Sequence, residues 1–112
     1  FWLALVCSVL IYLYVPELEW YVGMSGVLHG SFVLGLWWLF RQGDHLAAAL
    51  LLILLFKLIW EHFNGPISSD EDLVGVPVLT EAHSFGAVGA IVWLLCAQGM
   101  AFFLRSPDNG AP

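Results

Sequence analysis

This sequence has few charged residues. Of its 112 residues only three are Lys or Arg and nine are Asp or Glu, whereas 61% are hydrophobic. An average soluble domain is about 25% charged, and a domain this small buries too little surface to hide so many apolar residues in one core. The composition therefore excludes an ordinary soluble domain and a disordered chain.

Basic residues and cysteines are also scarce. Three basic residues and a net charge of −6 exclude a protein that binds nucleic acid electrostatically, so we expect no nucleic-acid partner. The two cysteines, Cys7 and Cys96, both lie inside apolar runs, where we expect buried small side chains and no disulfide. The environment that fits this composition is a lipid bilayer.

Four apolar segments make up most of the chain, at residues 1–15, 22–40, 46–60 and 82–104. A membrane-spanning helix takes about 20 residues, and a bilayer offers the backbone no hydrogen-bond partners, so each segment should be a helix. The sequence predicts an all-α membrane protein, with residues 1–112 forming a single multi-pass transmembrane domain.

The few charges are sorted by position. Arg41 and Arg105 follow the second and fourth segments and therefore fall on one membrane face, which the positive-inside rule makes cytoplasmic. Seven of the nine acids fall on the opposite face, most of them in the connector 61–81. Lys57 departs from the rule, but it can snorkel to the interface or pair with Glu61 four residues later.

This topology places Ser25 and His83 at a similar depth, because the second and fourth segments enter the membrane from the same face. A serine hydroxyl becomes nucleophilic when a base within hydrogen-bond reach takes its proton, and histidine is the usual base. Two small-residue patterns, Gly26-x-x-x-Gly30 and Gly86-x-x-x-Ala90, would let the two helices approach closely. We therefore treat Ser25 and His83 as a candidate catalytic pair.

Structural roles for the same residues stay open at this point. Serine is common in membrane helix contacts as a small hydrogen-bonding residue, and a buried histidine can be a structural partner. The sequence also differs from the nucleophile elbow of soluble hydrolases, because Val27 stands where Gly-x-Ser-x-Gly requires glycine.

The segments around both residues resemble the rhomboid intramembrane serine proteases. Gly23-Met24-Ser25-Gly26 is similar to the family's Gly-x-Ser-Gly motif, and Ala82-His83-x-x-Gly86 is similar to its Ala-His-x-x-Gly motif. The longer strings SGVLHG at 25–30 and EAHSFGA at 81–87 are closer still to the rhombosortase branch. The resemblance covers nearly the whole chain, as the last four of six core helices in a rhomboid-like helix bundle.

The resemblance implies a serine endopeptidase with a two-residue dyad and no cofactor or metal. Ser25 would be the nucleophile and His83 the general base, supported by Gly23, Gly26 and Gly86. The Ser25 backbone N–H would hold part of the oxyanion, and the connector 61–81 would be a cap over the site. The implied substrates are transmembrane proteins with C-terminal Gly-Gly sorting signals, cleaved near the outer face of a Gram-negative inner membrane.

His29 departs from the broad rhomboid pattern, in which an aromatic residue packs on the catalytic histidine. It lies one turn after Ser25 on the same face, so it could orient His83 or compete with it as the base, and we favour the supporting role. Two other functions remain as alternatives: a bis-histidine haem protein using His29 and His83, and a non-catalytic membrane binding protein. The sequence leaves the oligomeric state open.

Overall fold

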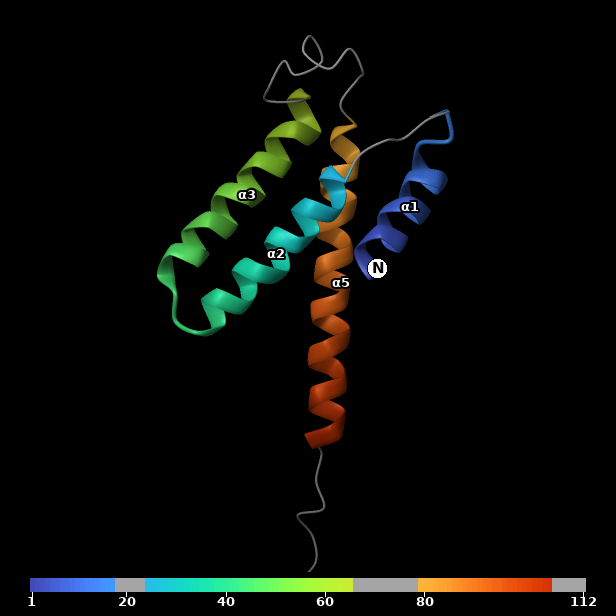
Figure 1. Ribbon diagram of the computed structural model, residues 1–112. Helices are drawn as coiled ribbons and strands as arrows, with labels where there is room; N and C mark the ends of the chain where they lie inside the picture. Colours follow the sequence, from blue (N-terminus) through green and yellow to red (C-terminus); the bar gives the residue numbers. More distant parts are fainter. Residues whose placement is uncertain (18–23, 66–78, 106–112) are drawn as a thin grey trace, which may run out of the picture.

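The described part of the protein is entirely helical. The computed structural model describes residues 1–17, 24–65 and 79–105. These residues form the helices α1 (Trp2–Tyr14), α2 (Ser25–Arg41), α3 (His45–Asn64) and α5 (Thr80–Arg105), which alternate in direction along the chain (Figure 1). The prediction of an all-α protein is confirmed for these residues.

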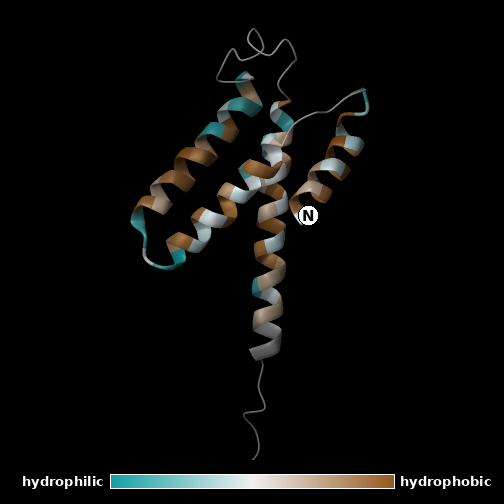
Figure 2. Cartoon of the chain, in the orientation of Figure 1, coloured by the Kyte–Doolittle hydropathy of each residue, from teal (hydrophilic) through white to brown (hydrophobic). Residues whose placement is uncertain are grey.

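Two of the helices are long and apolar enough to cross a membrane. These are α3 and the stretch Thr80–Ala101 of α5. With 13 and 17 residues, α1 and α2 are shorter than the roughly 20 residues of a typical span. In Figure 2 hydrophobic residues occupy most of α3 and α5, and polar residues gather near the end of α3.

The helix α3 continues four residues beyond the predicted end at residue 60. Asp44 caps its start by accepting hydrogen bonds from the N–H groups of Leu46 and Ala47. Its end is set by Gly65, whose φ of +82° suits glycine and stops the helix. Hydropathy falls at residue 61, but the backbone has no helix breaker until Gly65. The assignment of Glu61 to a connector was therefore wrong, because Glu61 belongs to α3.

Contact between α2 and α5 is the most extensive in the bundle, and glycines make it possible. A Cβ on Gly30 would lie 2.5 Å from the carbonyl oxygen of Gly86, and a Cβ on Gly86 would collide with the carbonyl of Gly26. The two backbones therefore touch directly at Gly26, Gly30 and Gly86, which we call the glycine contact. The close approach predicted from the small-residue patterns is confirmed.

The helix α1 packs against both α5 and α2 through one stripe. Leu3, Cys7 and Ile11, spaced four residues apart, are its buried side chains, and the Trp2 indole N–H donates to the Gly89 carbonyl at 3.0 Å. Cys7 and Cys96 are both free, as expected, but Cys96 is exposed.

Among residues 80–101 of α5, whose burial is described, the buried side chains are confined to the first part of the helix. Its buried residues lie between 82 and 90, whereas most of the helix from 91 to 101 is exposed.

Candidate active site

The glycine contact places Ser25 and His83 on facing turns of α2 and α5. Ser25 is the first residue of α2 and half-buried, and His83 is buried near the start of α5. Gly26, which follows Ser25, meets the carbonyl of Ala82, which precedes His83. The starts of α2 and α5 and the end of α3 lie at one end of the bundle (Figure 1). Gly23 lies outside the described residues.

Ser25 and His83 are neighbours without a direct hydrogen bond. Within residues 1–17, 24–65 and 79–105, the Ser25 hydroxyl makes no hydrogen bond to the His83 ring. Catalytic hydrogen bonds in free enzymes are often long and tighten only when substrate binds, so the separation is compatible with a serine–histidine pair. The assignment of catalytic roles to the two residues stays a prediction.

His29 packs face to face on His83. The two ring centroids are 4.1 Å apart and the ring planes differ by 17°. His29 reaches this position because it lies one turn after Ser25, and its Nδ1 bonds the Ser25 carbonyl oxygen at 2.7 Å. The contact fixes the plane of the His83 ring, which matches the supporting role favoured for His29.

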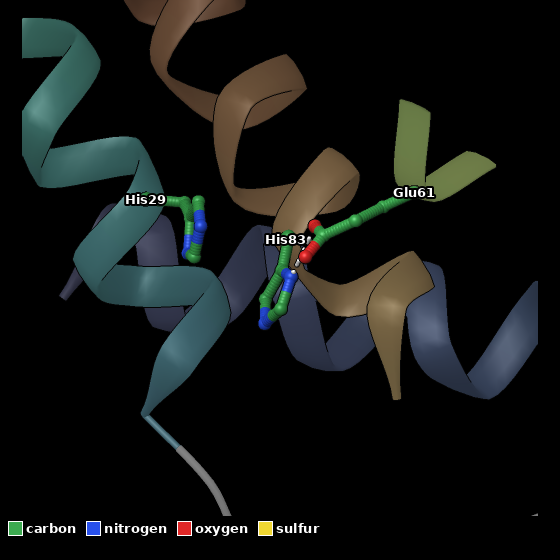
Figure 3. A group of neighbouring side chains, drawn as sticks. All are labelled: His29, Glu61 and His83. Atoms are coloured by element: carbon green, nitrogen blue, oxygen red, sulfur yellow. Dashed lines mark hydrogen bonds and ion pairs between the residues drawn. The ribbon is translucent and has the colours of Figure 1, made fainter. Parts of the chain in front are cut away.

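Glu61 is a site residue that the sequence interpretation missed. Its carboxylate is only 6% exposed, and its Oε2 lies 2.9 Å from Nδ1 of His83 (Figure 3). An ionisable residue inside an apolar helix is a functional candidate by default, and that signal could have identified it. The pattern did not show which way the carboxylate points, because the predicted helix ended one residue earlier.

Lys57 completes a polar network across three helices. Its Nζ lies 2.7 Å from Glu61 Oε2 and 3.1 Å from His29 Nε2. The predicted pairing of Lys57 with Glu61 is confirmed. A chain of hydrogen bonds thus runs from the Ser25 carbonyl through His29, Lys57 and Glu61 to His83, and joins α2, α3 and α5.

The partners in this network determine the tautomer of each imidazole. His29 Nδ1 faces a carbonyl oxygen, so it must donate, and its Nε2 accepts from the Lys57 ammonium. His83 Nδ1 faces a carboxylate, so it too carries the hydrogen. Of the four ring nitrogens of His29 and His83, three therefore have hydrogen-bond partners. The fourth, His83 Nε2, has none among the described residues. A neutral His83 in this tautomer has Nε2 available as a base.

The same residues are poorly arranged for a metal ion or a haem. Ligand atoms of His29, Glu61 and His83 lie within 4.8 Å of one another. However, the Lys57 ammonium already sits between Glu61 and His29, and a second cation there would be repelled. The two imidazoles also stack by their faces, whereas bis-histidine ligation requires both rings to aim a nitrogen at one iron from opposite sides. This arrangement does not suit either group.

Comparisons with known proteins identify no relative of this chain. No protein-family model matches the chain, and no match was found among curated proteins or solved structures.

Proposed function

We propose that this protein is an intramembrane serine endopeptidase of the rhomboid type, with Ser25 as nucleophile and His83 as general base. The observation that carries the proposal is the way in which the His83 ring is held. Its ring plane is fixed by His29, its Nδ1 is engaged by Glu61, and its Nε2 is unbonded among the described residues. A histidine held in this way beside a helix-terminal serine has the features of a catalytic base.

The proposed reaction is acyl transfer to serine followed by hydrolysis. Ser25 Oγ attacks the peptide carbonyl carbon while His83 Nε2 takes its proton. The C–N bond then breaks, and the proton passes from His83 to the departing amine. Water next attacks the carbonyl carbon of the Ser25 ester while His83 Nε2 takes a proton from it. The ester C–O bond then breaks, His83 returns the proton to Ser25 Oγ, and the carboxylic acid product leaves.

The start of α2 supplies hydrogen-bond donors for the oxyanion. The first backbone hydrogen bond of this turn runs from the Leu28 N–H to the Met24 carbonyl. The N–H groups of Ser25, Gly26 and Val27 therefore have no acceptor within the helix, and no side chain caps them at Met24. Donors at a helix start also carry its positive partial charge, which stabilises an oxyanion forming next to Ser25.

The apolar surface of the helices supports the proposal that the reaction takes place within a membrane. Large hydrophobic side chains are exposed on all four described helices, Leu5, Phe32, Phe56 and Leu95 among them. We propose a multi-pass bundle with the site near the outer face, acting on transmembrane substrates with Gly-Gly sorting signals. The acidic segment proposed as the cap lies mostly outside the described residues.

The test is to map a covalent label. The full-length protein in native membranes should react with a fluorophosphonate probe, and mass spectrometry should find the phosphonyl group on Ser25. His83→Ala should lower the labelling rate by at least about 10³-fold, because the serine then has no base. No labelling of Ser25 would favour the non-catalytic binding protein instead. Equal labelling of the His83→Ala variant would favour either a non-catalytic role for His83 or His29 as the base.

The role of His29 can be tested separately. His29→Phe keeps an aromatic face against His83, so its labelling rate should stay within about tenfold of wild type. His29→Ala removes that face, and the resulting misplacement of His83 should cost about 10²-fold. Complete loss in both variants would indicate that His29 is itself the base, and a lower rate in His29→Phe than in His29→Ala would contradict the stacking role.

A further inference from the structure

We infer that Glu61 is the third member of the catalytic group, a positioning residue that acts through His83. This inference rests on the proposed function and goes beyond the two-residue dyad. Glu61 reaches His83 from a third helix, α3, and engages the ring nitrogen opposite the one that must face Ser25.

The geometry is that of a histidine–carboxylate pair. The Nδ1–Oε2 distance of 2.9 Å is that of a hydrogen bond, and both side chains are buried, His83 and Glu61 each being 6% exposed. Figure 3 shows the carboxylate reaching from α3 to one edge of the His83 ring, with the second ring nitrogen on the far side. A carboxylate placed there selects the Nδ1–H tautomer and stabilises the imidazolium formed when His83 takes the serine proton.

A purely structural role explains this carboxylate less well. Burying an ion pair recovers little more than the cost of removing the charges from water, so apolar residues would hold α3 against α5 equally well. Glu61 also has an ion-pair partner without His83, because Lys57 lies 2.7 Å away on its own helix. The bond to His83 is an additional one, and it is the bond that determines how the imidazole is protonated.

Lys57 has a defined place in this arrangement. It offsets the charge of the buried carboxylate and, at 3.1 Å, donates to His29 Nε2. His29 in turn stacks on His83 at 4.1 Å. Two contacts thus fix His83: Glu61 fixes the rotation of its ring within the plane, and His29 fixes the plane.

The experiment compares turnover of Glu61 variants of the full-length protein in proteoliposomes. The probe is a reporter carrying a Gly-Gly segment, a transmembrane helix and a basic tail. Glu61→Gln should lower kcat at least about 10²-fold with KM unchanged, and Glu61→Asp should retain activity within about tenfold of wild type. Glu17→Gln is the matched control, an exposed acid three residues after the end of α1, and should stay within twofold.

Two further measurements separate positioning from folding. In a Ser25→Ala background, ¹⁵N shifts should show His83 protonated at Nδ1, and Glu61→Leu should convert it to a mixture of tautomers. The double variant Lys57→Gln/Glu61→Gln removes both charges of the ion pair, so it should melt near wild type and still turn over slowly.

Wild-type kcat in either the Glu61→Gln or the double variant, or an unchanged tautomer in Glu61→Leu, would overturn the role of Glu61. That result would leave the proposed function standing. If the fluorophosphonate probe does not label Ser25 in the wild-type protein, both the proposed function and the role of Glu61 are overturned.

Discussion

Replacing Ser25 with alanine is expected to abolish proteolysis while leaving the protein folded. The change removes only the hydroxyl that attacks the substrate, and Ser25 begins α2 at a half-buried position where alanine fits. Removing the nucleophile of a serine–histidine group costs about 10⁴-fold or more in kcat, because the remaining parts only bind substrate and stabilise charge. The rate of reporter cleavage in proteoliposomes measures this loss.

Ser31→Ala is the matched control for this prediction. Ser31 lies on the same helix, is exposed, and donates a hydrogen bond to the Val27 carbonyl at 2.8 Å within that helix. Its loss should change cleavage less than twofold. If Ser25→Ala and Ser31→Ala cleave the reporter at equal rates, Ser25 is not the nucleophile and the proposed mechanism fails.

Enlarging Gly86 is expected to have the largest effect on folding. A Cβ at this position collides with the backbone of Gly26, which cannot move aside as a flexible side chain would. Overpacking costs about 1–3 kcal/mol and occasionally more, and this site should lie at the upper end for Gly86→Ala. Gly86→Val should separate α2 from α5. Helical circular dichroism during thermal unfolding in detergent micelles measures the difference.

Gly99→Ala provides the comparison on the same helix. Apart from its chain neighbours and the nearby backbone of its own helix, no atom of the described residues lies within 4 Å of a Cβ at Gly99. Alanine also favours the helix over glycine by about 1 kcal/mol, so this variant should unfold at the same or a slightly higher temperature. Equal melting of Gly86→Ala and Gly99→Ala would show that the glycine contact does not hold the bundle together.

Much of the arrangement of α2 and α5 could be predicted from the sequence. The spacing of Gly26 and Gly30 on one helix and Gly86 on the other marks where two backbones can touch. Hydropathy and the two arginines gave the direction of the segments, and together these placed Ser25 near His83. The glycine pattern is local, so it survives small errors in the helix ends.

Glu61 could not be found in the same way. Hydropathy shows where a polar residue interrupts an apolar run, whereas a helix ends only where the backbone is broken, here at Gly65. Between those two points lie residues that are polar and still helical. Whether such a residue faces water or the bundle depends on the rotation of α3 against α5, which no periodicity in the sequence fixes when most of α3 is apolar on every side.

The glycine contact also determines how the spacing between Ser25 and His83 can change. Glycine has no rotamers, so holding the two backbones together freezes no side chains at the point of contact and costs little side-chain entropy. No side chain at the contact can change its rotamer and so alter the distance between α2 and α5. The spacing of the two residues therefore changes only when α2 and α5 move against each other as rigid bodies.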